Sequence, residues 1–298
     1  MAALVCAMDG ELYMTDRRSG PRLGAHTYLF TQYGVDQAAQ LEEIFDTVAA
    51  AGFPAIELPR QALEAPDFVG RAAAAAGRTG LGIVGVSHGQ PLWNTAKRGE
   101  IVEDMTQHAE SMAELAAAAP EAIGPTGRLQ CGLSCSGKKY ADRSAEESDQ
   151  VLALWHELGT RFREKGLTLA HHTHGEPIED IRFVAEHVPA DVLAFGPDLD
   201  WLRVGGVDPE EFLRTYGSRV TMMHLRDYQA GGTRAEDRTA AIGEGDVDYA
   251  RLRRVLDEIG FRGEAVVELA WPPGAERDRT AAEILTQSRE HLRRTMGL

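Results

Sequence analysis

The chain has little cysteine and no long hydrophobic run. Only 3 of its 298 residues are cysteine, and their spacing is not that of a disulfide framework, which agrees with a reducing compartment. Cys131 and Cys135 share one face of a predicted strand, so we interpret them as packing residues rather than ligands. No segment reaches the ~18 consecutive apolar residues of a membrane helix, and the N-terminus lacks the basic start of a signal peptide. We therefore expect a cytoplasmic protein that does not enter a membrane.

Positive charge is also in short supply. The chain has 31 Lys and Arg residues against 46 Asp and Glu residues, which gives a formal net charge of −15. Proteins that hold nucleic acids neutralise phosphates with Lys and Arg, so this balance argues against nucleic acid as a partner. The loops after the last two predicted strands contain no basic cluster for a phosphate, although barrels often place one there. We expect a substrate without phosphate groups.

Eight short apolar stretches alternate with eight longer stretches of helical periodicity. This alternation predicts a parallel sheet, because each crossover needs a helix, and eight such units are the size of a (β/α)8 TIM barrel. An open, doubly wound sheet is the alternative, but the glycine-rich turn that it usually carries after its first strand is missing. The predicted strands cover 22–28, 54–58, 81–87, 128–134, 167–172, 192–197, 220–225 and 264–269, and the predicted helices cover 36–51, 66–77, 98–119, 144–165, 177–187, 208–216, 247–259 and 277–295.

The barrel is expected to occupy residues 22–298 as a single α/β domain. Residues 1–21 are polar and turn-rich, and they predict an N-terminal extension that is partly disordered or docks against a partner subunit. The loop at 226–246 is rich in Gly, Arg, Asp and Thr, and we expect it to act as a mobile lid. We also expect the chain to form a homo-oligomer.

Polar residues mark the carboxyl ends of the predicted strands, which is where barrels of this kind place their active sites. A single buried histidine in a strand is usually a hydrogen-bonded structural residue. A polar group at nearly every strand end is different, because burying unpaired charge is costly and such an interior needs a cation or a polar ligand. These residues are His26, Glu57, His88, His171, His172, His174, Glu176, Asp198, Asp200, His224, Asp227 and Glu268.

The last four strands can be assigned more closely. Glu268 lies between aliphatic residues in V-V-E-L, His224 is placed similarly in M-M-H-L, and Asp198 follows the sixth predicted strand. The alternation of side chains in a strand lets only one of the adjacent His171 and His172 face the interior. Two imidazoles and two carboxylates make a nitrogen and oxygen shell that suits Mn, Co, Zn, Fe or Ni better than Mg or Ca. We therefore predict a divalent metal site, with Mn, Co or Zn preferred to Mg.

Four longer segments carry a family pattern. They are D-L-D-W-L-R-V-G-G-V-D-P at 198–209, S-R-V-T-M-M-H-L-R-D-Y at 218–228, I-G-E-G-D-V-D-Y at 242–249 and F-R-G-E-A-V-V-E-L at 261–269. These segments resemble the xylose-isomerase-like TIM barrel superfamily, which includes sugar-phosphate isomerases and epimerases, ketose 3-epimerases and inosose dehydratases. Arg226 stands where the family usually has Lys. The resemblance is a strong signal for the superfamily and a weak one for the substrate.

The resemblance implies that Asp198, His224 and Glu268 are metal ligands. The fourth ligand in many members is a glutamate at the end of strand five, and here that position is His172, within H-H-T-H-G-E. This is similar to the H-x-H-x-G variant of inosose-dehydratase-like members. Epimerases of the family move a proton between two facing glutamates. His172 departs from that scheme, and Glu176, four residues further on, is the candidate for the second role.

The expected chemistry is proton transfer next to a carbonyl group. A divalent ion held by adjacent oxygens of a keto-sugar acidifies the neighbouring C–H bond and stabilises an enediolate. Glu268 is expected to be the base, and His172, His174 or Glu176 would return the proton or protonate a leaving hydroxyl. We expect substrate contacts from His26, Glu57, His88, His174, Trp201 and Arg226.

We rank four candidate functions from these expectations. The first is a metal-dependent isomerase or epimerase of an unphosphorylated ketose or keto-sugar. The second, favoured by His172, is a dehydratase or lyase of a keto-inositol, keto-sugar or keto-glycoside. An apurinic-site endonuclease, which shares this barrel, is a remote third because of the acidic charge. A catalytically inactive barrel that serves as a subunit of an assembly is the fourth. In the first two, the partner is a small sugar or cyclitol.

Overall fold

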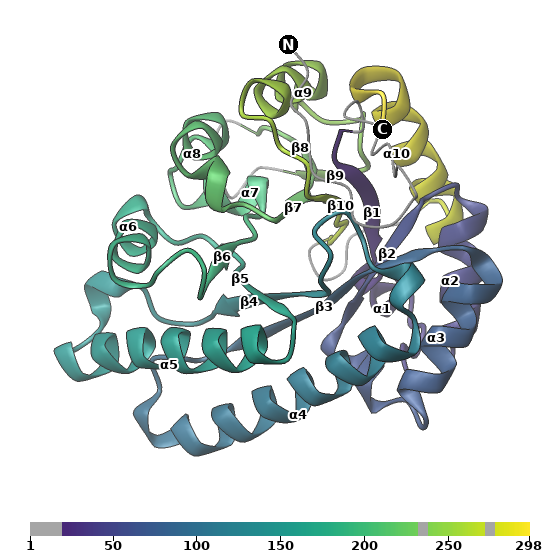
Figure 1. The fold of residues 1–298 in the computed structure, drawn as a ribbon. Coiled ribbons are helices and arrows are strands. Elements are labelled where there is room, and N and C mark those ends of the chain that lie inside the picture. The colour runs from purple at the N-terminus through teal and green to yellow at the C-terminus, as the bar shows by residue number, and fades with distance from the viewer. Residues whose placement is uncertain (1–19, 232–237, 272–277) are drawn as a thin grey trace, which may run out of the picture.

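The computed structural model describes residues 20–231, 238–271 and 278–298. Eight parallel strands form one sheet in the order β6-β5-β4-β3-β2-β1-β10-β7. Two isolated bridges, Phe195 with Val220 and Asp198 with His224, connect β6 to β7, so the barrel is nearly closed (Figure 1). The predicted (β/α)8 barrel is confirmed. Its strands are β1 (Arg22–His26), β2 (Ala55–Pro59), β3 (Gly82–Gln90), β4 (Gln130–Cys135), β5 (Thr168–His171), β6 (Ala194–Phe195), β7 (Met222–Leu225) and β10 (Glu264–Val267).

The helices lie around the outside of this sheet, as Figure 1 shows. The α-helices are α1 (Tyr28–Gln32), α2 (Leu41–Ala50), α3 (Phe68–Thr79), α4 (Arg98–Ala118), α5 (Ala145–Glu164), α6 (Ile178–His187), α7 (Leu199–Val204), α8 (Pro209–Tyr216), α9 (Tyr249–Glu258) and α10 (Ala281–Met296). Short 3-10 helices are η1 (Arg60–Glu64), η2 (Thr95–Lys97), η3 (Pro120–Ala122), η4 (Tyr140–Asp142) and η5 (Gly217–Arg219). None of these described helices combines the length and the apolar character that a membrane crossing needs.

Helix-capping signals in the sequence have mixed outcomes. The capping box at the start of α5 is present, with Ser144 accepting the amide of Glu147. Asp36 does not cap the next helix, because α2 begins only at Leu41. The carboxylate of Asp36 instead accepts the amides of residues 38 and 39, which form a turn before the helix.

The structure differs from the prediction in several segments. The short helices α1 and α7 follow strand ends directly and were not predicted. The sixth strand, predicted over 192–197, contains only two residues. The predicted lid loop contains an antiparallel pair, β8 (Asp227–Gln229) and β9 (Arg238–Ala240). Residues 232–237 of this loop, position 277 of the last predicted helix, and residues 1–19 of the predicted extension lie outside the described residues.

The interior of the barrel is filled in layers, because every second residue of each strand faces inward. Near the amino-terminal ends of the strands, Arg22 and Glu264 form an ion pair of 2.8 Å. The layer near the carboxyl ends of the strands is polar and contains the site described below. Between these two layers lies a separate apolar cluster of Ala55, Val84, Ala170, Ala194, Met222 and Val266.

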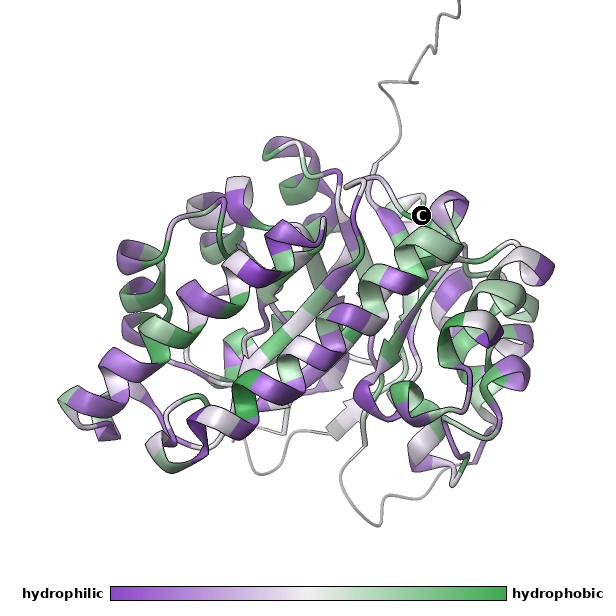
Figure 2. Ribbon diagram, turned by 60° about the horizontal axis from the view of Figure 1, so that its bottom comes forward, coloured by the Kyte–Doolittle hydropathy of each residue, from purple (hydrophilic) through white to green (hydrophobic). Residues whose placement is uncertain are grey.

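The larger hydrophobic core lies between the sheet and its helices. It includes Phe45, Trp155 and Phe162, all fully buried, from α2 and α5. The helices show the matching pattern in Figure 2, with hydrophobic residues on one side and hydrophilic residues on the other. Cys131 and Cys135 of β4 are buried in this core as free thiols, which confirms their interpretation as packing residues.

Gly85 holds β3 close to β4 beside the site. It pairs with Glu57 of β2 on one side and with Gln130 of β4 on the other. A Cβ atom at this position would lie 1.7 Å from the carbonyl oxygen of Gln130. Only glycine therefore allows the three strands to keep this spacing.

Two glycine substitutions test this close approach. Gly85→Ala should lower the free energy of unfolding by at least about 2 kcal/mol, because the methyl group overlaps the backbone of β4. Gly77→Ala, inside α3 with no atom within 4 Å of the added carbon, should raise it by ~0.5–1 kcal/mol. Urea denaturation measures both. A Gly85→Ala protein as stable as the native one would contradict the described packing.

Candidate metal centre

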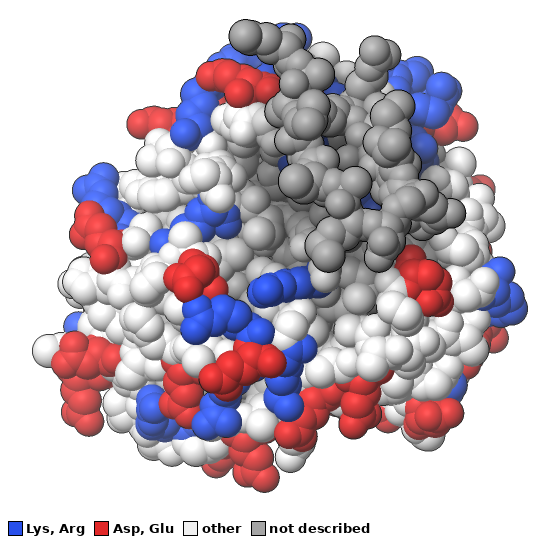
Figure 3. Space-filling view, viewed as in Figure 1, with Lys and Arg blue, Asp and Glu red and all other residues white. Residues whose placement is uncertain are grey.

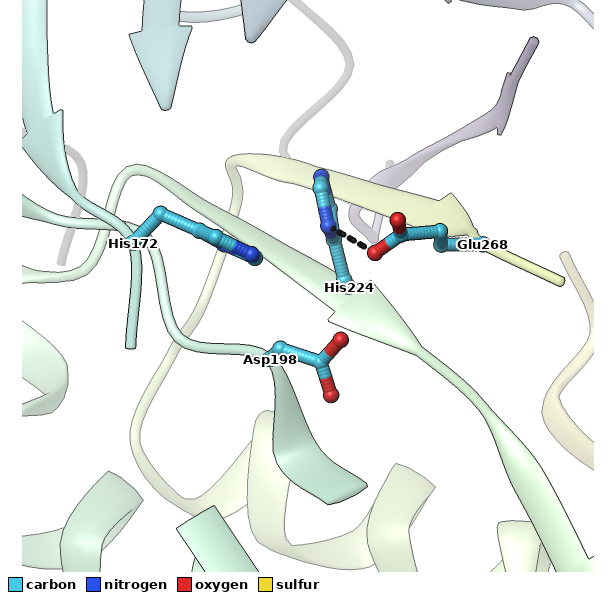
Figure 4. A group of neighbouring side chains, drawn as sticks. All are labelled: His172, Asp198, His224 and Glu268. Carbon is cyan, nitrogen blue, oxygen red and sulfur yellow. Dashed lines mark hydrogen bonds and ion pairs between the residues drawn. The ribbon is translucent and has the colours of Figure 1, made fainter. Parts of the chain in front are cut away.

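Four side chains from the ends of β5, β6, β7 and β10 meet at the carboxyl end of the barrel (Figure 4). Each offers one atom that could bind a metal ion, and these four atoms lie within 4.8 Å of one another. Three of the residues are buried and the fourth, Glu268, is partly exposed. The structure thus brings together all four residues predicted as ligands: His172, Asp198, His224 and Glu268.

The two adjacent histidines of strand five point to opposite faces of the sheet, and only one of them faces the barrel interior. Ala170 belongs to the inner apolar layer, so His172 also faces inward and His171 faces outward. His171 packs between Trp155 of α5 and Phe195 of β6, and burial lowers its pKa to about 3. The ring of His172 has its Nδ1 atom 3.1 Å from the carbonyl oxygen of Gly196. If Nδ1 donates to that carbonyl, the Nε2 atom of His172 is free to bind a metal ion.

His224 lies between two carboxylates. Its Nδ1 atom is 2.8 Å from Glu268, as the dashed line in Figure 4 shows, and its Nε2 atom is 2.8 Å from Glu57. Burial by itself lowers the pKa of His224, but the two carboxylates outweigh burial and raise this pKa well above its ordinary value. A protonated ring satisfies both carboxylates, and a metal ion at Nδ1 would have to displace one proton.

Arg226 brings a second cation to the same place. Its Nε atom is 2.8 Å from Asp198, and a terminal nitrogen is 3.2 Å from Glu268. Burial opposes ionisation of Glu268, but Arg226 and His224 outweigh it and lower the pKa of Glu268 well below its ordinary value. Burial dominates at Asp198 and raises the pKa of this carboxyl group. Arg226 therefore stabilises Glu268 as a carboxylate.

With His224 neutral, as a metal ligand must be, the charges of these buried groups do not balance without a further cation. Glu57, Asp198 and Glu268 carry three negative charges when ionised, and Arg226 carries one positive charge. The difference of two equals the charge of one divalent ion. Asp198 Oδ1 accepts the amides at the start of α7, and Oδ2 forms an ion pair of 2.8 Å with Nε of Arg226. The donor set and its charge thus fit a divalent metal ion.

The cluster opens into a cavity of about 930 Å³ at the mouth of the barrel. Five of the six predicted substrate contacts line this cavity: His26, His88, His174, Trp201 and Arg226. The sixth, Glu57, does not line it. Its side chain is fully buried behind His224 and also accepts a hydrogen bond from the hydroxyl of Ser87.

Aromatic side chains form much of the cavity wall. The rings of His174 and Trp201 are stacked with their centroids 4.0 Å apart. Tyr28, Tyr228 and Trp271 line the same cavity. Flat apolar faces next to polar groups suit a sugar or cyclitol ring, which presents C–H bonds on its faces and hydroxyl groups at its edge.

Glu176 does not occupy the position that its proposed catalytic role requires. It does not line the cavity, and its carboxylate accepts the backbone amide of His174. Burial raises the pKa of Glu176 to about 7. In the structure, Glu176 therefore supports the strand-five loop.

Some partners of the cavity-wall residues carry no sequence motif and were not predicted. Asp104 of α4 lies 2.8 Å from Nε2 of His88 and also pairs with Arg60 of η1. Such pairs join segments that only the fold brings together. Trp271 was open to prediction, since it follows the family pattern around Glu268 by three residues.

Asp227 fixes the loop that follows β7. Its carboxylate accepts backbone amides from residues 243, 245 and 247, at 2.7, 3.1 and 3.2 Å. A Cβ atom at Gly245 would lie 2.0 Å from this carboxylate, so the turn needs glycine there. Glu244 of the same turn pairs with Arg279 next to α10. These contacts hold the G-E-G turn against the rim of the barrel.

The chain belongs to the xylose isomerase-like TIM barrel family, whose model matches residues 45–295. Curated relatives include inosose dehydratases. That of Geobacillus thermodenitrificans is 26% identical over 173 residues, which are 51% of this chain and 56% of the relative. That of Klebsiella pneumoniae is 26% identical over 178 residues, which are 52% of this chain and 57% of the relative. The chain thus spans little more than half the length of these relatives.

Solved structures share the fold over nearly the whole chain. One described as L-ribulose 3-epimerase has a TM-score of 0.74 at 15% identity and covers 93% of this chain and 95% of its own. A probable 3-DHS dehydratase from Bacillus anthracis has a TM-score of 0.68 at 16% identity. The match covers 91% of this chain and 98% of that structure's chain. Family and fold therefore place the chain in an enzyme superfamily with dehydratase and epimerase relatives.

The raised pKa of Glu176 predicts a pH effect on stability. Its pKa is about 7 in the folded protein against an ordinary value of 4.5, so folding binds a proton between these values and stability falls as pH rises through them. Glu176→Gln removes this loss. Relative to the native protein, the variant should gain roughly 1–3 kcal/mol of unfolding free energy between pH 4.5 and pH 8.

Urea denaturation at several pH values measures this difference. Glu179→Gln, at an exposed glutamate three residues further on, is the matched control and should show no such gain. Parallel pH profiles for the native protein and Glu176→Gln would mean that Glu176 is not buried as described.

Proposed function

We propose that this chain is a divalent-metal-dependent lyase that removes water from a keto-polyol, such as a keto-inositol or keto-sugar. The observation that carries the proposal is the composition of the site. One glutamate, Glu268, lines the cavity within a cluster of four metal-binding side chains, and the position where many relatives have a second glutamate holds His172. One carboxylate next to a carbonyl-activating ion is sufficient for elimination of water.

The metal ion would be held by His172, Asp198, His224 and Glu268, with Mn, Co or Zn favoured by the nitrogen and oxygen donors. When bound, the ion supplies electrophilic activation of the substrate carbonyl, which acidifies the adjacent C–H bond. Arg226 keeps Glu268 ionised, so that it can accept a proton at neutral pH.

In the proposed reaction, Glu268 removes the proton from the carbon next to the carbonyl. The electrons of that C–H bond form a double bond as the C–O bond to the hydroxyl on the following carbon breaks. The proton on Glu268 passes to the departing hydroxyl, which leaves as water and restores the carboxylate. This sequence uses a single acid–base group, which agrees with Glu268 as the one glutamate among the described residues that line the cavity.

The arginines of the cavity wall support a substrate without phosphate. Arg60 pairs with Asp104, Arg203 with Asp200, and Arg226 with Asp198 and Glu268. On the described part of the face in Figure 3, basic and acidic side chains are interspersed and form no broad basic patch. A neutral polyol fits this wall better than a phosphorylated sugar or a nucleic acid.

Isomerisation or epimerisation is the second candidate, and this reverses the order expected from sequence. Epimerisation by two facing glutamates needs a second glutamate at the cavity, and Glu176 is buried away from it. The imidazole of His174 is the observation that keeps the candidate open, because it lines the cavity and could return the proton to a different position.

Metal binding is tested by thermal stability. Mn²⁺ or Co²⁺ should raise the melting temperature of the native protein, since a ligand that binds only the folded state stabilises it. Asp198→Asn should lose most of this shift, because the amide keeps the cap of α7 but not the charge. Asp208→Asn, at the cap of α8, is the matched control and should keep the shift. An equal shift in all three proteins would place the ion elsewhere.

The reaction is tested by NMR in D₂O with metal-loaded enzyme and a panel of keto-inositols and free ketoses. We expect exchange of the hydrogen next to the carbonyl, together with formation of an unsaturated ketone from a keto-inositol. Glu268→Gln should lower the rate by ~10²–10⁴-fold at saturating metal. An epimer or aldose in place of the enone would favour the second candidate. A metal-loaded enzyme that exchanges no hydrogen with any member would contradict both.

A further inference from the structure

Glu57 is placed to control a residue of the candidate metal centre without touching substrate. Its Oε2 atom lies 2.8 Å from Nε2 of His224. The exposed fraction of the Glu57 residue is 0%, and that of His224 is 1%. The hydroxyl of Ser87 donates to the other carboxylate oxygen, Oε1. Both oxygens of this buried carboxylate are therefore engaged by groups on two other strands, β3 and β7.

The chemistry of this contact determines which nitrogen of His224 carries a proton. An ionised carboxylate can only accept hydrogen bonds, so Nε2 of His224 must be the donor. The other nitrogen, Nδ1, then carries the lone pair once the ring is neutral. Nδ1 is the atom that contacts Glu268, one of the four clustered residues. A carboxylate behind a histidine also makes the imidazole a stronger ligand.

His172 has a weaker version of the same arrangement. Its Nδ1 atom faces the carbonyl oxygen of Gly196 at 3.1 Å, which is neutral. Glu57 is the only partner of either candidate imidazole, among the described residues, that is a carboxylate outside the cluster itself. Its charge also contributes to the negative potential that a divalent ion would neutralise.

We propose that Glu57 is a positioning residue that orients His224, fixes the proton on Nε2, and strengthens the binding of a divalent cation by the four-residue cluster. This inference rests on the proposed metal site and goes beyond it. It assigns to β2 a part in metal affinity, although β2 contributes none of the four candidate ligands.

The test is the affinity of metal-free protein for Mn²⁺ or Co²⁺, measured by competition with a chelating indicator. Glu57→Gln keeps the size of the side chain and removes its charge, and its amide can either accept from or donate to Nε2. We expect a 10–100-fold weaker affinity. Glu264→Gln is the matched control, since Glu264 is equally buried in the same barrel but lies near the amino-terminal ends of the strands beside Arg22. It should bind the ion as tightly as the native protein.

A second measurement reports on the proton itself. Long-range ¹H–¹⁵N spectra of Zn²⁺-loaded protein labelled in histidine should show His224 protonated at Nε2, and Glu57→Gln should lose this fixed form. If Glu57→Gln does not fold, Ser87→Ala removes the hydroxyl that holds Oε1 and should weaken metal binding in the same direction by a smaller factor. Circular dichroism confirms the fold of each variant before titration.

The outcomes separate the two proposals. A native protein that binds the ion, together with a folded Glu57→Gln that binds it equally well, would overturn the role of Glu57 and leave the proposed function intact. Equal weakening by Glu264→Gln would show a general effect of removing buried charge and would also overturn it. A native protein without affinity for Mn²⁺, Co²⁺ or Zn²⁺ would overturn the metal-dependent function itself.

Discussion

The carboxyl end of this barrel encloses more negative charge than its own cations neutralise. Glu57, Asp198 and Glu268 are buried or nearly so, and Arg226 is the cation that pairs with two of them. Such an arrangement is costly in an interior of low dielectric unless a further positive charge is present. A proton on His224 supplies part of this positive charge, and a divalent ion supplies all of it. The candidate function follows from this imbalance, because an ion bound here lies beside the cavity and next to Glu268.

The fold creates this excess of negative charge because side chains alternate between the two faces of each β-strand. Ala170 and His172 on strand five, and Met222 and His224 on strand seven, follow one another on the inner face. Each strand therefore passes from the apolar layer to the polar layer in two residues. Gly85, which pairs with Glu57, lets β3 approach β4 closely at this level of the barrel. The solved epimerase and dehydratase structures share this barrel fold, and in this chain the imidazole of His172 lies beside a single cavity glutamate.

The sequence was sufficient for the barrel and for the four clustered residues, because both depend on local periodicity and on the position of strand ends. It was not sufficient for the roles of Glu57 and Glu176. Both are carboxylates near strand ends, and only the packing of other strands shows that one lies behind His224 and the other supports a loop. The salt bridge of Arg226 to Asp198 joins residues on different strands and has no local signal. The cytoplasmic location, the homo-oligomer and the absence of a nucleic-acid partner stay predictions.

The most direct measurement is a crystal structure of the protein grown with Mn²⁺, with data collected to reveal the anomalous signal of the metal. Our account predicts one strong peak about 2.0–2.3 Å from a nitrogen of His172, a nitrogen of His224 and carboxylate oxygens of Asp198 and Glu268. It also predicts that Nε2 of His224 still contacts Glu57 in that crystal. An empty cluster in which Arg226 still bridges Asp198 and Glu268 at saturating Mn²⁺ would contradict the account.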